Sequence, residues 1–213
     1  EKKPDGVAVF FDTPELTERH RIFKEYKAHR PETPGELVQQ LPRIREMIKA
    51  FNISIFEMPG YEADDLIGTV AKEAGKKRSN VFIVTADKDM LQLVDENIKI
   101  YDPVKDRILD DKYVKEKFGV DPERVPEFMA LTGDAADNIP GIKGIGEKTA
   151  KELLTAFKGL DELLSHPEMI KKERLRSLVS ENADIARLSK RLATIDTSVP
   201  MDFDLKEFRL KEP

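Results

Sequence analysis

The chain has 213 residues, of which 39% are hydrophobic and 36% charged, and its formal net charge at pH 7 is −5. This length allows one large domain or two small ones, and no apolar run approaches the ~20 residues needed to cross a bilayer. The absence of cysteine excludes a disulfide scaffold, a thiolate zinc site and a cysteine nucleophile, and a net negative charge disfavours a uniformly basic nucleic-acid coat.

The first half of the chain alternates strand and helix signals. Short runs of β-branched and aromatic residues predict strands at 7–11, 54–58, 81–85 and 98–101. Between and after them, apolar periodicity predicts helices at 16–30, 37–51, 63–74 and 87–94. The second of these helices begins either at Leu37 or near Pro42, because proline favours the first helical turn. This rhythm argues for a parallel sheet with crossover helices.

The second half reads differently. After about Lys105 strand signals fade, and helices joined by short loops take over. The expected helices span 112–118, 125–132, 147–157, 160–164, 171–180 and 185–195. The sequence therefore predicts an α/β core over residues 1–105 and a helical subdomain over residues 106–213.

Carboxylates follow three of the predicted strands at the point where each strand ends. They are Asp12 after the first, Glu62, Asp64 and Asp65 after the second, and Asp87 and Asp89 after the third. Each cluster taken alone is explained as well by helix N-caps. Since ligands of an open parallel sheet bind outside the carboxyl ends of its strands, these groups should gather at one edge. Carboxylates so close would repel one another unless cations lay between them.

Two further aspartates, Asp134 and Asp137, lie in a polar loop of the helical half, where they could also merely stabilise a turn. A ligand set of oxygens, without His or Cys, favours Mg²⁺ or Mn²⁺ over zinc. A site with many carboxylates suits two metal ions that clamp a phosphodiester. The sequence therefore predicts metal-dependent hydrolysis of phosphoesters.

A basic stretch from Arg19 to Arg30 offers a way to hold such a substrate, with five Lys or Arg against one Glu. On the predicted helix Arg19, Phe23, Tyr26 and Arg30 share one face. Basic and aromatic side chains together can follow a phosphate backbone and stack on unpaired bases. A solvated helix with Phe23 and Tyr26 in the core explains the pattern equally well.

Residues 139–150 form the most specific segment. Glycines at 141, 144 and 146 let the backbone approach a ligand, the next helix offers free N–H groups, and lysines surround the loop at 143, 148 and 151. The spacing nearly matches a nucleotide phosphate loop, but Glu147 stands where the lysine belongs and no strand precedes it. A hairpin that grips a nucleic-acid backbone is favoured over a plain glycine-rich turn.

Four segments carry a resemblance to a known family: GYEADD (60–65), TADKDMLQL (85–93), LTGDAADNIPGIKGIGEKTA (131–150) and FKEYKAHRPETP (23–34). They closely resemble the 5′-nuclease domain of bacterial DNA polymerase I, which belongs to the flap endonuclease family. The resemblance implies a PIN-like α/β core with a helix–three-turn–helix (helix-hairpin-helix) subdomain. It also implies 5′→3′ exonuclease and structure-specific flap endonuclease activity with two divalent ions, Mg²⁺ or Mn²⁺.

The resemblance also assigns roles to individual residues. The implied metal-site carboxylates are Glu62, Asp64, Asp65, Asp87, Asp89, Asp134 and Asp137, with Asp12 close to them. Tyr26, Lys27 and Arg30 resemble residues of a helical arch that steer the 5′ strand and contact the scissile phosphate. The expected DNA-binding residues are Arg19, Gly141, Lys143, Gly144, Gly146, Lys148, Thr149 and Lys151. The hairpin from Gly141 to Gly146 would hold the downstream duplex and a potassium ion, bound through backbone carbonyls.

The resemblance departs from the family at one place. Residues 7–12 match the family's second strand, so its first strand and the metal-ligating Asp at the end of it have no counterpart. We expect a monomeric fragment of a longer protein with a linked polymerase domain. It would act on flapped, nicked or forked DNA in the bacterial cytoplasm near the nucleoid, away from membranes. The alternative is a catalytically incomplete fragment that only binds DNA.

Two other chemistries compete with this interpretation. A phosphatase of the haloacid dehalogenase type needs Asp-x-Asp at its first strand, but Pro14 stands where the second Asp is required after Asp12. A PIN-type ribonuclease would share the fold, yet the helix–hairpin–helix half favours duplex DNA. Preferred cleavage of a small phosphomonoester would support the first, and preferred cleavage of single-stranded RNA the second.

Overall fold

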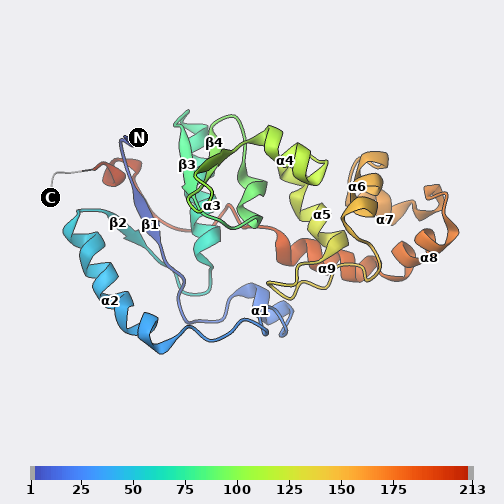
Figure 1. Ribbon diagram of the computed structural model, residues 1–213, viewed down its shortest axis with the longest axis horizontal. Coiled ribbons are helices and arrows are strands. Elements are labelled where there is room, and N and C mark those ends of the chain that lie inside the picture. The colour runs from blue at the N-terminus through green and yellow to red at the C-terminus, as the bar shows by residue number, and fades with distance from the viewer. Residues whose placement is uncertain (1–2, 211–213) are drawn as a thin grey trace.

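The computed structural model describes residues 3–210 (Figure 1). Its strands are β1 (Ala8–Phe10), β2 (Ser54–Phe56), β3 (Val81–Val84), β4 (Ile98–Asp102) and β5 (Arg107–Leu109). Its α-helices are α1 (Glu18–Ile22), α2 (Gly35–Ala50), α3 (Ala63–Lys76), α4 (Asp111–Phe118), α5 (Val125–Thr132), α6 (Glu147–Ala156), α7 (Leu160–Ser165), α8 (Glu173–Glu181) and α9 (Ala183–Ala193). Short 3₁₀ helices are η1 (Asp89–Leu93), η2 (Pro122–Arg124), η3 (Pro167–Met169) and η4 (Leu205–Phe208). Across residues 3–210, every helix is too short or too polar to span a bilayer.

Within the described residues the strands form two sheets, where the sequence predicted one. β1 pairs in parallel with β2, β3 pairs in parallel with β4, and β5 adds to β4 in the antiparallel sense. The two parallel pairs confirm the predicted strand directions. Helix α3 contacts both β1 and β3 and so joins the two sheets. The sequence missed β5, because three residues after a turn give too short an alternation to recognise.

Three helical predictions need correction. The helix predicted over 16–30 ends at Ile22, and residues 24–29 form turns. Lys27 has a φ of 56° there, which an α-helix cannot accommodate, and its N–H donates to the carbonyl of Asp137 at 3.0 Å. Helix α2 begins at Gly35, so Pro42 lies inside it and starts nothing. The helix predicted over 87–94 is the 3₁₀ helix η1.

A single buried hydrophobic cluster runs through both halves of the chain. It includes Leu91 and Ile100 from the α/β half and Leu131, Leu154 and Leu192 from the helical half. Helix α5 packs against α6, α9 and η1, and so links the helical half to the sheet half. The loops that carry the predicted carboxylates are therefore mounted on one continuous core.

The chain after α9 runs back along the α/β half to β1 (Figure 1). Gly6 and Arg209 form an antiparallel bridge, and the N–H of Val7 donates to the carbonyl of Phe208 at 2.7 Å. The ring of Phe208 packs against that of Phe56 in β2, with centroids 5.3 Å apart. The last described residues thus contact β1 and β2 of the α/β half.

Gly141 allows the loop after α5 to pack against its own beginning. Its φ is +59°, and a Cβ there would lie 2.1 Å from the backbone nitrogen of Gly133. We expect Gly141→Ala to lower the free energy of unfolding by about 3 kcal/mol or more, because the backbone must shift from a conformation that alanine disfavours. Gly146→Ala, where an added Cβ meets nothing within 4 Å, should cost under about 1 kcal/mol. Urea unfolding compares the two variants, and equal losses would contradict this packing.

Candidate metal centre and nucleic-acid interface

The predicted carboxylates come from four places in the fold: the loop after β1, the start of α3, the start of η1 and the loop after α5. One carboxylate oxygen from each of Asp89, Asp134 and Asp137 lies within 4.8 Å of the others. The structure thus brings residues of the α/β half and the helical half into one acidic group.

A tight turn places the two aspartates of the helical half. Asp134 and Ile139 exchange both backbone hydrogen bonds, at 2.9 and 2.8 Å, which closes the turn that contains Asp137. Both aspartates are buried, at 7% and 6% exposure. The ammonium of Lys88 donates to Asp134 at 2.7 Å. Asp134 therefore has a cation beside it, and Asp137 is turned inward on the same loop.

Lys88 acts on Asp89 through its charge and makes no hydrogen bond to the buried Oδ1. This oxygen has no hydrogen-bond partner among the described residues. Burial, followed by the charges of Asp87 and Asp134, raises the pKa of Asp89 to about 7. Asp87 lies alongside, because its Oδ1 accepts the N–H of Asp89 at 2.9 Å. A buried carboxylate oxygen without a donor, among other carboxylates, is suited to a cation.

A second acidic group surrounds Asp64 in the first turn of α3. Burial, followed by the charge of Asp87, raises the pKa of Asp64 to about 7, and Glu62 and Asp12 add smaller effects of the same sign. Asp12 lies at this helix start, since its Oδ1 accepts the N–H of Ala63 at 2.7 Å. The charge of Asp87 acts on both Asp64 and Asp89, so Asp87 lies close to both acidic groups.

Tyr26, Lys27 and Arg30 face these carboxylates. The ammonium of Lys27 donates to Glu62 at 2.7 Å and lies 3.8 Å from a carboxylate oxygen of Asp137. Arg30 donates to the other oxygen of Asp137. The hydroxyl of Tyr26 lies within 3.3 Å of Glu62 and 3.2 Å of Asp137. Burial, and then the charge of Glu62, raises the pKa of Tyr26, so its hydroxyl stays protonated as a donor.

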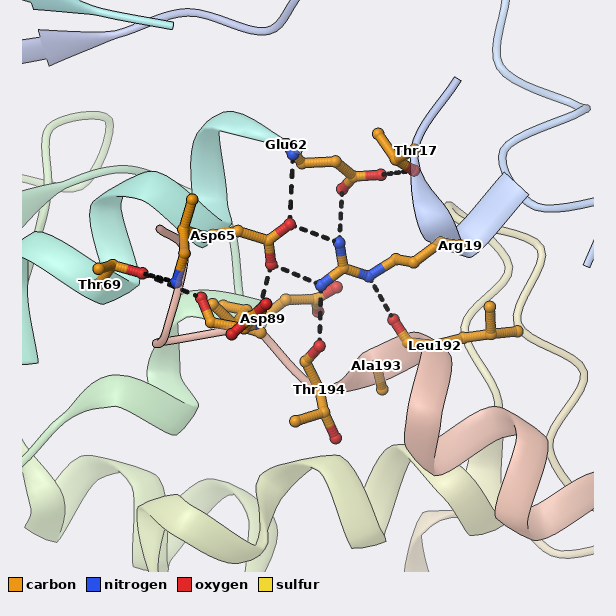
Figure 2. A network of polar contacts seen from close by, with 12 residues as sticks. Thr17, Arg19, Glu62, Asp65, Thr69, Asp89, Leu192, Ala193 and Thr194 are labelled. Carbon is orange, nitrogen blue, oxygen red and sulfur yellow. Dashed lines mark hydrogen bonds and ion pairs between the residues drawn. The ribbon is translucent and has the colours of Figure 1, made fainter. Parts of the chain in front are cut away.

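Arg19 and Asp65 face each other rather than the solvent (Figure 2). The guanidinium binds both carboxylate oxygens of Asp65, at 2.8 and 2.7 Å. The side chains are 11% and 3% exposed. Two residues that the sequence suggested for DNA and metal contact are therefore paired with each other.

In the hairpin after α5 and the first turn of α6, some of the residues predicted to bind DNA are exposed to solvent and others are not. Lys143, Gly144, Gly146 and Lys148 are exposed, Thr149 and Lys151 are half-buried, and Gly141 is buried. Ile142 and Ile145 anchor the loop in the core, at 2% and 4% exposure. Gly146 is the N-cap of α6 and provides no side-chain cap, so the first backbone N–H groups of this helix are left for a ligand near Lys143 and Lys148.

Sequence reasoning missed two features of the site. Lys88, in contact with Asp134, lies between Asp87 and Asp89, and its position inside an acidic motif was a usable signal. The end of α9 and the chain after it (residues 192–199) also reach the site, through hydrogen bonds to Arg19 and Asp65. These bonds use backbone groups, which leave no trace in a sequence.

Comparisons with known proteins agree along the whole chain. Residues 1–119 match the family described as 5′-3′ exonuclease, N-terminal resolvase-like domain, and residues 120–213 match 5′-3′ exonuclease, C-terminal SAM fold. The chain is 43% identical to DNA polymerase I of Caldicellulosiruptor bescii, over 100% of this chain and 26% of that protein. It is 36% identical to a 5′-3′ exonuclease of Aquifex aeolicus, over 100% of this chain and 72% of that protein. The chain thus spans about a quarter of the polymerase relative's length.

Solved structures with the same fold come from bacteriophage T5. A flap endonuclease in a complex with DNA and metal ions superimposes with a TM-score of 0.77 at 22% identity, over 89% of this chain and 74% of that one. A 5′-exonuclease with bound zinc gives a TM-score of 0.75 at 21% identity, over 89% of this chain and 74% of that one. These likenesses confirm the predicted fold, an α/β core followed by a helical subdomain.

Proposed function

Because the chain belongs to the 5′-3′ exonuclease family, we propose that it hydrolyses DNA phosphodiesters as a 5′→3′ exonuclease and 5′-flap endonuclease. The observation that carries this proposal is the meeting of an oxygen-only acidic centre with Tyr26, Lys27 and Arg30. Its place would be within a DNA polymerase I of the bacterial cytoplasm, as a monomeric nuclease joined to a polymerase domain in replication and repair.

The donor set fits two divalent ions. Asp89, Asp134 and Asp137 would hold one, since their oxygens lie within 4.8 Å of one another and Asp89 Oδ1 is buried without a donor. Asp64 and Asp87 would hold the other, with Glu62 and Asp12 beside them. Carboxylate oxygens are the ligands of Mg²⁺ and Mn²⁺. Bound there, the ions would supply an activated water and stabilise the leaving oxygen.

The basic side chains would bind and orient the phosphate. Lys27 and Arg30 have hydrogen-bonding donors suited to phosphate oxygens, and Arg30 is about half exposed, at 49%. Tyr26 is fixed by its burial, so the loop that carries the two cations is held beside the carboxylates. These residues would place the scissile phosphate against the acidic centre, which is the positioning that phosphoryl transfer requires.

The exposed hairpin would hold the downstream duplex by its backbone. Lys143→Ala combined with Lys148→Ala should weaken duplex binding at all sequences. It should also reduce the slope of log affinity against log salt by about one for each phosphate that the variant no longer neutralises. Lys76→Ala with Lys77→Ala removes the same charge from the far end of α3 and serves as the control. An unchanged slope in the hairpin variant would remove the hairpin from the interface. Replacing K⁺ by Na⁺ in the same assay tests the proposed potassium ion there.

The decisive experiment is cleavage of a 5′-labelled flap duplex by this chain with Mg²⁺, Mn²⁺ or EDTA, beside a binding assay in Ca²⁺. Cutting near the flap junction that EDTA abolishes would support the nuclease. Binding without cutting would favour the catalytically incomplete DNA-binding fragment. Faster cleavage of single-stranded RNA or of a small phosphomonoester would replace the proposal by one of the two competing chemistries.

A further inference from the structure

The last two residues of α9 and the chain that follows them are held by side chains of other elements. We call residues 192–199 the strap. Arg19 donates to the carbonyls of Leu192 and Thr194, at 3.0 and 2.8 Å. Gln92 donates to the carbonyl of Ala193 and accepts the N–H of Ile195, both at 2.9 Å. Four backbone groups in the first half of the strap therefore bind a side chain, although the strap joins no sheet.

The strap continues onto α3. Asp65 accepts the N–H of Asp196 at 2.9 Å, and Thr69, one turn further along the same helix, accepts the N–H of Val199 at 3.1 Å. The hydroxyl of Thr69 also lies 3.4 Å from the carbonyl of Asp196. Figure 2 shows Arg19, Asp65 and the strap meeting at one point. The strap is thus bound by α1, α3 and η1, all of which belong to the α/β half.

Asp65 and Arg19 use their bonding capacity within this network. Asp65 accepts two bonds from Arg19, one from the N–H of Asp196 and one from the N–H of Glu62 at 3.2 Å. Arg19 donates to two strap carbonyls and to both oxygens of Asp65. A carboxylate that already accepts four bonds is a poor metal ligand, and a guanidinium so engaged has little left for a phosphate.

We propose that Arg19 and Asp65 are positioning residues that fix the two halves of the acidic centre relative to each other. Their pair binds the strap to α3, whose first turn carries Glu62 and Asp64. The strap in turn extends α9, which packs on α5, the helix that leads into Asp134 and Asp137. The inference rests on the proposed metal-dependent function, because it concerns where the metal-binding carboxylates lie.

Metal binding by the folded chain tests this inference, measured by calorimetric titration with Mn²⁺. Arg19→Gln and Asp65→Asn should each raise the Mn²⁺ Kd about tenfold or more, the range seen when outer partners of a metal site are lost. The double variant should be no worse than either single one. Simple charge predicts the opposite for Arg19→Gln, since removal of a cation beside carboxylates should tighten metal binding.

The control is Glu18→Gln, which breaks an exposed ion pair with Arg191 between the same two elements, α1 and α9. It should leave the Mn²⁺ Kd unchanged. Thr69→Val loosens the strap without touching a carboxylate and should raise the Kd by a smaller factor. Duplex binding in EDTA gives a further readout: the salt slope of Arg19→Gln should equal that of the parent chain, whereas a lower slope would make Arg19 a DNA contact and overturn the proposal.

Amide hydrogen exchange keeps this test separate from the proposed function. The N–H groups of Ile195 and Asp196 should be protected in the parent chain and in Glu18→Gln, and lose protection in Arg19→Gln. If the parent chain binds no Mn²⁺, the proposed metal-dependent function fails. Hydrogen exchange alone then tests whether Arg19 and Asp65 hold the strap in place. Unchanged protection in Arg19→Gln, or an unchanged Mn²⁺ Kd in a chain that binds Mn²⁺, would overturn the inference.

Discussion

Replacing Asp89 with asparagine should abolish metal-dependent flap cleavage and, at the same time, stabilise the metal-free chain. Cleavage should fall by at least about a hundredfold, because loss of an outer partner alone costs up to that much metal affinity. Stability should rise by about 1 kcal/mol or more at pH 8, since the neutral amide would replace a buried charge that its neighbours oppose. Flap cleavage in Mg²⁺ and thermal unfolding in EDTA measure the two effects.

The opposite signs make this variant informative. Substitution of a residue that merely supports the fold would lower both the stability and the activity of the chain. Substitution of a buried metal ligand should raise the stability and lower the activity. Asp184→Asn is the matched control, because its side chain is fully exposed and lies in the first turn of α9. It should change neither quantity. Full cleavage by Asp89→Asn would remove Asp89 from the metal centre.

The metal-free chain should lose stability as the pH rises from 5.5 to 8. The folded pKa values of Asp64 and Asp89 are both about 7, raised from 3.8, because the carboxyls are buried among other acids. Between pH 3.8 and about 7, these two carboxyls are deprotonated in the unfolded chain but still protonated in the folded chain. A higher pH therefore favours unfolding. The loss from each carboxyl is on the order of 2 kcal/mol over this window. Thermal unfolding in EDTA at a series of pH values measures it.

Mg²⁺ or Mn²⁺ should oppose this loss. Divalent ions bind the deprotonated carboxylates of the folded chain, so their stabilising effect should grow with pH over the same window. The double variant Asp64→Asn, Asp89→Asn should show a flatter pH dependence in EDTA and little response to metal. A parent chain whose stability rises from pH 5.5 to 8 in EDTA would contradict the burial of these two acids.

The sequence predicted the acidic centre better than the elements around it. The runs ending at Thr85 and Met58 predict strands, and acids directly after a strand end lie at that edge of the fold. The expectation that the strand ending at Thr85 has both faces covered is wrong, because Phe82 and Val84 of β3 are 40% and 64% exposed. Asp134 and Asp137 could be joined to them only through the resemblance, since nothing in the spacing tells where a loop of a helical half will lie.

The basic segment shows where periodicity misleads. Phe23 and Tyr26 have helical spacing, yet the chain there forms turns, because Tyr26 is drawn in toward Glu62 and Asp137 and the backbone of Lys27 binds Asp137. The ion pair between Arg19 and Asp65 could not be predicted from the sequence either. Both residues are charged and lie in plausible binding motifs, and only the fold shows that they neutralise each other.

The bridge between Gly6 and Arg209 has a consequence for how the chain folds. Contacts between distant parts of a sequence slow folding, because a long loop must close before they form. On a ribosome, β1 and β2 would emerge early. The residues around Arg209 that pair with this region would emerge only when synthesis of the described chain is nearly complete. During that interval their exposed edges would be open to wrong pairing with other strands.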